Sequence, residues 1–190
     1  MCSFVIVGDA LFCTGDNDGG QLGLDGHEYR EEFTCVPERN FLMVSCSESH
    51  TCVIDTELCL WSCGWNDYGQ LGLGDLGKRT IFSKVGENKF ISVSCGASHT
   101  AAIDENGHLW ICGGDTQIQP SPESNENRHI LTRIGVAADA DDAASVADVN
   151  NVRKFAQVCC GAYHTMALDQ DGYLWACGGN LGGLLGLGDL

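Results

Sequence analysis

The sequence predicts an all-β fold built from a repeated unit of short strands, and three observations support this prediction. An aromatic residue recurs at spacings of 49, 49 and 65 residues, as Phe12, Trp61, Trp110 and Trp175. The chain holds 25 glycines but only 3 prolines, which fits tight turns between strands better than long helices. Segments such as FISVSC (90–95) alternate apolar and polar residues with period two.

Each unit divides into strands separated by turn residues. After the alternating segment 90–95 we expect a hairpin with strands at 99–104 and 108–113, joined by the sequence DENG. The last unit repeats this hairpin at 166–169 and 173–178 around DQDG. Asp, Asn and Gly favour such turns, because Gly accepts positive φ and Asp or Asn can bond its own backbone. A unit of about 50 residues with several short strands is typical of a propeller blade.

The repeated positions pair a cysteine with a histidine, and a tryptophan with a glycine. They are Cys46, His50, Trp61, Gly64, Cys95, His99, Trp110, Gly113, Cys160, His164, Trp175 and Gly178. We therefore expect one partial β-propeller over 1–190. Its units are a partial one at about 1–40, complete ones at 41–89 and 90–154, and a partial one at 155–190. The third unit carries an insertion at 115–151.

These units resemble the regulator of chromosome condensation (RCC1-type) repeat family. The segments that carry the resemblance are CGASHTAAIDENGHLWICGG, CGAYHTMALDQDGYLWACGG and GWNDYGQLGLGD. The resemblance implies blades of four-stranded antiparallel sheet, usually seven in a closed ring. Seven blades need about 350 residues, so this chain is expected to hold about three to four. An open arc leaves a blade face uncovered at each end, and we expect it to self-associate or to take blades from another chain.

The repeated Cys-x-x-x-His pairs suggest metal ligands or Cys–His catalysis. A catalytic pair has no reason to be copied at blade spacing, and zinc needs four converging ligands. Equivalent positions in adjacent blades should stand too far apart for that, so we interpret the cysteine as a buried thiol and the histidine as holding backbone groups between strands. The repeated tryptophans, and Cys63, Cys112 and Cys177, are expected in the core, without disulfides. We predict no cofactor, no metal and no catalytic residue.

Two features depart from the repeat and are candidates for partner binding. Trp65 does not recur, since Gly114 and Gly179 occupy its counterpart positions, and we expect it to be exposed at a blade rim. The insertion at 115–151 begins as a polar loop and continues as an Ala/Asp stretch that is disordered or marginally helical. Its acidic side chains are candidate partner contacts: Asp139, Asp141 and Asp142. An unselected surface insertion is the alternative.

The net charge is −16, from 26 acidic and 10 basic residues. This balance favours basic protein partners and disfavours direct binding of nucleic acid. No apolar run is long enough to cross a membrane. The N-terminal segment lacks the basic region of a signal peptide. The sequence therefore predicts a cytoplasmic or nuclear location, with the 12 cysteines reduced.

Three hypotheses for function remain open. The first is a non-enzymatic scaffold for protein–protein interaction. The second comes from the resemblance, because the founding member of the family is a guanine-nucleotide exchange factor for a small nuclear GTPase. That activity implies no covalent chemistry, and none of its residues can be matched to this chain. The third is a fragment of a larger propeller protein, such as a ubiquitin ligase.

Overall fold

The computed structural model describes residues 1–37, 40–114, 128–134 and 153–188, and all regular elements in these ranges are strands. No helix in the described part of the chain has the length and apolar character of a membrane span. The strands are β1 (Cys2–Val7), β2 (Ala10–Gly15), β3 (Arg30–Cys35), β4 (Phe41–Cys46), β5 (His50–Asp55), β6 (Cys59–Gly64), β7 (Arg79–Cys95), β8 (His99–Asp104), β9 (Leu109–Gly113), β10 (Arg128–Arg133), β11 (Phe155–Cys160), β12 (His164–Asp169) and β13 (Leu174–Gly178).

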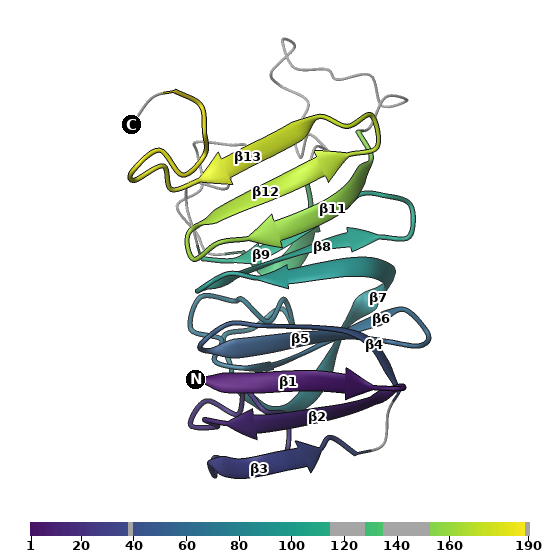
Figure 1. Cartoon of the computed structure of the whole chain (residues 1–190), viewed down its shortest axis with the longest axis vertical. Helices are drawn as coiled ribbons and strands as arrows, with labels where there is room; N and C mark the ends of the chain where they lie inside the picture. Colours follow the sequence, from purple (N-terminus) through teal and green to yellow (C-terminus); the bar gives the residue numbers. More distant parts are fainter. Residues whose placement is uncertain (38–39, 115–127, 135–152, 189–190) are drawn as a thin grey trace.

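The strands form four antiparallel units that stack along the long axis of the molecule (Figure 1). Blade 1 is β1-β2-β3, and blade 4 is β11-β12-β13. The seven strands β4 to β10 form one hydrogen-bonded sheet, because the long strand β7 belongs to two blades. Its first part pairs with β6 (Lys84 with Trp61), and its last part pairs with β8 (Val93 with Ala102). Blade 2 is therefore β4-β5-β6 with the start of β7, and blade 3 is the end of β7 with β8-β9-β10.

The expected fold class is confirmed, as an incomplete β-propeller. Blades 2 and 3 have four strands each, and blades 1 and 4 have three among the described residues. The hairpins expected at 99–104 and 108–113 are β8 and β9, and the alternating segment 90–95 is the last part of β7. The strand β10 was not predicted: it lies within 115–151, where the sequence suggested only a loop and an Ala/Asp stretch. The strand β3 and the first part of β7 were not located from the sequence either.

The hydrophobic core lies between the blades. Every residue of β5 and of β8 is buried, because these strands are covered by a neighbouring blade on each side. One cluster joins blades 1 and 2 through Leu11, Phe41 and Phe82, and a second cluster joins blades 2 and 3 around Phe90. A third joins blades 3 and 4 around Phe155 and is made largely of residues from β8, β9 and the two strands of blade 4 that pack on them. Each blade thus depends on its neighbour for the burial of its apolar face.

Blade 4 has no neighbour on its outer face among the described residues. Leu60, Leu109 and Leu174 occupy the same position in blades 2, 3 and 4. They are 1%, 6% and 64% exposed. Leu184 and Leu187, which follow blade 4, are also exposed. The uncovered blade face expected from an open arc is therefore present at this end.

A buried aspartate organises the turn of each complete hairpin. In blade 3, Asp104 Oδ1 accepts hydrogen bonds from the backbone N–H groups of Asn106 and His108, both at 2.9 Å. Its second oxygen, Oδ2, accepts from the indole Nε1 of Trp110 at 2.9 Å. The same aspartate–indole bond joins Asp55 to Trp61 at 2.7 Å and Asp169 to Trp175 at 2.9 Å.

This bond corrects the expectation that the repeated tryptophans are core residues. Trp61 and Trp110 are only partly buried and pack against the edge of the core. Trp175 is 44% exposed, because no described strand covers this side of blade 4. The guanidinium of Arg153 lies over the Trp175 ring, 3.9 Å from its centroid. The indole is placed at the edge since its N–H must reach the aspartate of the turn.

Candidate partner-binding face

One side of the arc gathers the loops that carry the GWNDYGQLGLGD segments, and we call it the loop face. It holds the loops after β2, β6 and β13 and those before β5, β8 and β12, on the left in Figure 1. Asn66 shapes its central loop: Oδ1 accepts the Leu71 N–H at 2.9 Å, and Nδ2 donates to the carbonyl of Asp75 at 2.8 Å. These bonds make the loop a fixed support for its side chains.

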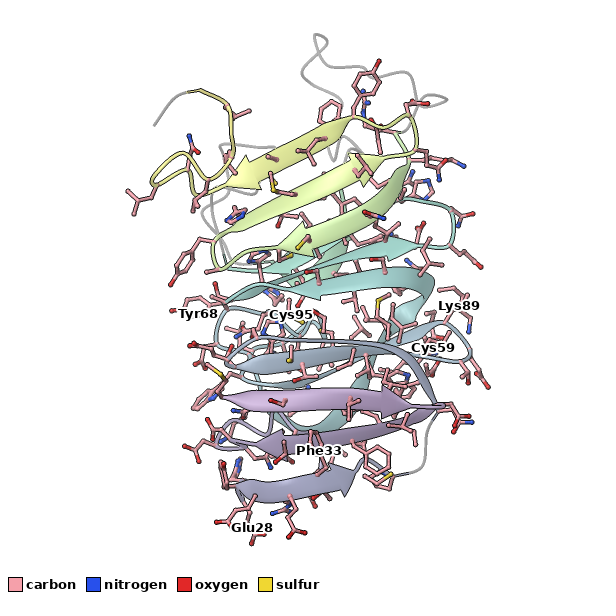
Figure 2. All side chains as sticks on the ribbon, in the orientation of Figure 1. Glu28, Phe33, Cys59, Tyr68, Lys89 and Cys95 are labelled. Carbon is pink, nitrogen blue, oxygen red and sulfur yellow. The ribbon has the colours of Figure 1, made fainter. Side chains whose placement is uncertain are left out.

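A groove of about 450 Å³ lies on the loop face and spans blades 2, 3 and 4. Its aromatic walls are Trp65, Tyr68 and Tyr163, which are 38%, 51% and 62% exposed. The other lining residues are Ser49, Asp67, Gln70, Ala97 and Ser98. Figure 2 labels Tyr68 at this edge of the molecule. Exposed aromatic side chains with polar tips, gathered in one groove, are typical of protein-binding surfaces.

Trp65 exposes only part of its side chain for binding, because the rest of the ring packs between blades 1 and 2. A Cβ added at Gly19 of blade 1 would lie 2.2 Å from the Trp65 ring. At the next interface the sizes are reversed: Tyr68 packs on Gly114, where an added Cβ would lie 2.9 Å from the tyrosine. Gly19 and Tyr68 are equivalent positions, as are Trp65 and Gly114. Trp65 therefore does not recur because the large residue lies on the other side of the next interface, where Tyr68 packs on Gly114.

The groove has a positive and a negative side chain at its edge, whereas the chain as a whole is strongly acidic. Lys78 Nζ lies over the Trp65 ring, 5.3 Å from its centroid, in a cation–π contact. Asp67 lines the groove beside it. The expectation of an exposed Trp65 at a blade rim is therefore met in part, since 38% of the residue reaches solvent. The candidate contacts Asp139, Asp141 and Asp142 lie outside the described residues.

The repeated histidines link blades rather than backbone groups within one blade. His50 and His99 are buried, and each Nε2 lies within hydrogen-bond distance of a threonine hydroxyl in the next blade. The two bonds are His50 to Thr100 at 2.8 Å and His99 to Thr165 at 2.9 Å. We interpreted the histidines as holding backbone groups between strands, but the Nε2 partners in these two bonds are threonine side chains of the neighbouring blade.

The repeated cysteines differ from one another. Cys95 is buried and Cys160 is half-buried, and their thiols donate to the Ser45 and Ser94 carbonyls of the preceding blade at 3.2 and 3.3 Å. Cys46 is exposed, contrary to expectation. Cys63 and Cys112 are buried, but Cys177 is only half-buried, because blade 4 is uncovered. All 12 cysteines lie in the described residues and are free thiols.

Blade 1 replaces the histidine by Cys2. Cys2 pairs with Gly15 as His50 pairs with Gly64, so the two occupy the same place in the sheet. The thiol–thiol hydrogen bond between Cys2 and Cys46 raises the pKa of Cys2 and lowers the pKa of Cys46 to about 7. The threonine that a histidine would have met, Thr51, is left with a buried hydroxyl that has no hydrogen-bond partner.

Sequence reasoning missed Tyr68 and Tyr163 as candidate contacts. Both stand inside repeated segments, where most positions serve the fold. Their signal was that each is an aromatic residue at a loop position where the other units carry different residues: Gly19 and Gly182 are equivalent to Tyr68, and Ser98 and Ser49 are equivalent to Tyr163. Only the structure shows that these two loops border one groove.

Two models of the regulator of chromosome condensation (RCC1) repeat match the sequence. One matches residues 9–54 and 59–103, and the other matches 44–70, 90–119 and 155–183. A sequence search among curated proteins finds no match.

Several solved structures share the fold. Human WBSCR16 superposes with a TM-score of 0.82 at 20% identity, over 100% of this chain and 48% of that protein. Yeast RCC1 (Prp20), solved with Kap60, gives 0.76 at 21% identity, over 96% of this chain and 42% of Prp20. Prp20p from Saccharomyces cerevisiae, reported with its binding properties to Gsp1p and histones, gives 0.70 at 20% identity, over 95% and 44%. The chain spans less than half the length of each of these proteins.

Proposed function

The chain belongs to the regulator of chromosome condensation repeat family, and from this premise we propose that it is a non-enzymatic protein-interaction module. Its loop face binds a basic segment of a partner protein. The groove between Trp65, Tyr68 and Tyr163 is the observation that carries this proposal.

The groove has the composition of a binding site for a peptide segment. Tyr68 and Tyr163 are more than half exposed, yet each has only two side-chain torsions to fix on binding. Their rings offer apolar area and their hydroxyls offer hydrogen bonds. The loops that hold them are fixed by side-chain bonds such as that of Asn66, so little loop ordering opposes binding.

Charge supports a basic partner. A chain with a net charge of −16 attracts cationic segments over several ångströms and speeds their encounter. Lys78 over Trp65 shows that this part of the face already accommodates an ammonium group against an aromatic ring. Prp20p, which shares the fold, is reported with binding properties to histones. Asp139, Asp141 and Asp142 are proposed as a second acidic contact.

The test uses a fluorescent Lys/Arg-rich peptide and a matched peptide in which Glu replaces the basic residues. Anisotropy titrations with the whole chain are expected to show binding of the basic peptide alone, weakening as salt rises. Replacing both Tyr68 and Tyr163 by Ala should weaken binding at least tenfold. Tyr173→Ala is the matched control, because Tyr173 is 65% exposed in the turn between β12 and β13, away from the loop face.

Two results would contradict the proposal. One is equal affinity for the two peptides, and the other is an equal loss of affinity in the Tyr173 variant and the double variant.

A second candidate is regulation of a small GTPase, which the fold shared with Prp20p supports, since that protein is reported with binding properties to Gsp1p. Release of a fluorescent guanine nucleotide from a panel of small GTPases tests it. Acceleration by the chain, lost when Tyr68 is replaced by Ala, is the expected result. No acceleration with any GTPase of the panel would leave the peptide-binding role as the proposal.

The uncovered face of blade 4 suggests that further blades complete the arc, from a second copy of this chain or from a longer propeller protein such as a ubiquitin ligase. Leu174, 64% exposed where its equivalents are buried, supports this. Light scattering on the reduced chain separates the two sources: a compact dimer indicates a second copy, and a monomer indicates a longer parent. For either case we propose a cytoplasmic or nuclear location.

A further inference from the structure

A cluster of three metal-ligating side chains is buried between blades 2 and 3. It consists of His50, Cys52 and Cys95, whose ligand atoms all lie within 4.8 Å of one another. The residues are 0%, 1% and 8% exposed. His50 and Cys52 are two residues apart on β5, so their side chains leave the same face of the sheet. Cys95 comes from the end of β7 in the next blade, and Figure 2 labels it there.

The cluster corrects the argument that zinc ligands could not converge in this fold. Equivalent positions in adjacent blades are not the ones that meet. The structure instead brings a histidine of one blade to the cysteine of the next, because these two positions face each other across the interface.

The imidazole is already oriented as a ligand. The Oγ of Ser47 lies 2.9 Å from His50 Nδ1, which leaves Nε2 facing the cluster. Nε2 is 2.8 Å from Thr100 Oγ1, and Cys52 Sγ is 3.7 Å from the same oxygen. Bonding of the second ring nitrogen is the usual way in which proteins fix a metal-binding histidine. Four heteroatoms thus converge: one nitrogen, two sulfurs and one hydroxyl oxygen.

The next interface shows which of these groups the fold needs. There His99, Cys160 and Thr165 take the places of His50, Cys95 and Thr100. His99 Nε2 and the Cys160 thiol lie 2.9 and 3.7 Å from the Thr165 hydroxyl. Ala101 stands in place of Cys52, and Gly96 stands in place of Ser47. The histidine–threonine bond is therefore common to both interfaces, and alanine at the position of Cys52 is enough for the packing of the second one. Blade 2 adds the extra thiol and the serine that orients the ring, and packing alone explains neither.

We propose that His50 Nε2, Cys52 Sγ and Cys95 Sγ bind one thiophilic d¹⁰ metal ion. Zn²⁺ is the favoured ion, and Cu⁺ is the alternative. Imidazole and thiolate are the ligands that both ions prefer. Because the Thr100 hydroxyl donates to the Gln70 carbonyl, His50 Nε2 donates to Thr100 and must give up its proton before it can bind the ion. That proton moves to Nδ1, which then donates to Ser47 Oγ. Binding also releases the two thiol protons, and the two thiolates then balance the charge of Zn²⁺ in a buried site. Thr100 Oγ1 is the nearest group for a fourth position, whereas Cu⁺ needs only the three ligands.

The geometry demands little movement. Ligand atoms about 2.0–2.3 Å from a tetrahedral zinc ion stand roughly 3.3–3.8 Å from one another. Atoms already within 4.8 Å reach such separations by small rotations of the side chains. The ion would then join blades 2 and 3 as a crosslink, in place of the bond between His50 Nε2 and the Thr100 hydroxyl.

The test titrates the whole chain with Co²⁺ under oxygen-free, phosphine-reduced conditions. We expect one equivalent to give thiolate-to-cobalt absorption and tetrahedral d–d bands, both removed by one equivalent of Zn²⁺. A parallel titration with Cu⁺ against a Cu⁺-selective chelator shows which ion binds more tightly. The melting temperature should rise when the preferred ion is added.

Cys52→Ala is the decisive variant, because the next blade uses alanine at the same place. It should fold, lose the cobalt spectrum and show no rise in melting temperature with metal. Cys52→Ser gives a second variant of similar size that is a poor ligand, with the same expected loss. Cys46→Ala, at an exposed thiol outside the cluster, should keep one equivalent. The proposal is overturned if folded wild-type chain takes up neither ion, or if both Cys52 variants bind as wild type does.

Discussion

The turn between β8 and β9 offers a sharp test of the repeat, through the replacement of Asp104 by Ala. Asp104 is a buried residue, 5% exposed. It accepts bonds from the N–H groups of Asn106 and His108 and from Trp110 Nε1, all at 2.9 Å. The ring Nδ1 of His108 lies 3.0 Å away as well. Alanine removes every one of these bonds at once.

The expected loss follows from the bonds that the carboxylate makes. A hydrogen bond to a charged group contributes about 1.5–3 kcal/mol. Water can reach part of this turn and replace some of the lost bonds, so we expect a loss of about 3–5 kcal/mol in the free energy of unfolding. Asp104→Asn keeps the acceptor for the backbone N–H groups but turns an NH₂ group towards Trp110. Its loss should be about half as large.

Urea unfolding, followed by circular dichroism and tryptophan fluorescence, measures these values. Glu105→Ala is the control, because Glu105 is the exposed neighbour in the same turn, and it should change stability by less than about 0.5 kcal/mol. If the Asp104→Ala chain unfolds within about 1 kcal/mol of wild type, the reasoning that this aspartate holds the turn is refuted.

The same variant carries a pH test. Burial acts to raise the pKa of Asp104, but the bonds from His108 and Trp110 outweigh it and leave the pKa below its usual value. A carboxyl with a lowered folded-state pKa stabilises the fold above its unfolded-state pKa of about 3.9, and this stabilisation is lost as pH falls through the folded-state pKa. The difference between wild type and Asp104→Ala should therefore shrink below about pH 4. An equal difference at neutral pH and at about pH 3 would contradict this.

Three further predictions concern the blade interfaces. Thr100→Val removes the bonds to the histidine of the preceding blade and to the Gln70 carbonyl and should cost about 1–3 kcal/mol. Thr51→Val, whose hydroxyl has no partner, should be neutral or stabilising in the same melts, and an equal loss in both would contradict the pairing. Cys46 is exposed and has a pKa of about 7, so iodoacetamide should alkylate it before the other cysteines at neutral pH. Peptide mass spectrometry identifies the labelled cysteine, and earlier labelling of another cysteine would refute this. Leu60→Ala should lower the free energy of unfolding by about 2–5 kcal/mol, whereas Leu174→Ala should lower it by under about 1 kcal/mol in the isolated chain. Urea titrations measure both values, and comparable losses would mean that blade 4 is covered.

Much of the fold was predictable because the repeat fixes local chemistry. The alternation at 90–95 and the turn DENG are local features, and β8 and β9 formed where they indicate. The strands β3 and β10 were not predicted, because their segments lie outside the repeated motif. The long β7 was only half predicted, since its first part, from Arg79, is the fourth strand of blade 2 and precedes the alternating segment 90–95.

The candidate site was less predictable than the fold. Trp65 was identified, but its contact with Gly19 depends on how blade 1 packs against blade 2. Tyr68 and Tyr163 are 95 positions apart in the sequence and border one groove. The repeated cysteines and histidines were interpreted as structural positions, but their hydrogen-bond partners were not identified, because those partners lie in other blades.

The sequence by itself determined the unit: its period, its hairpins and the aspartate, tryptophan and glycine positions that a four-stranded blade requires. These depend on interactions between residues close in the chain, which a repeated pattern reveals. Only the tertiary structure decided what one blade offers to the next. The convergence of His50, Cys52 and Cys95, the exposed face of Leu174 and the groove of the loop face all arise between blades. Such contacts depend on the angle and spacing at which whole blades pack, and no local pattern encodes them.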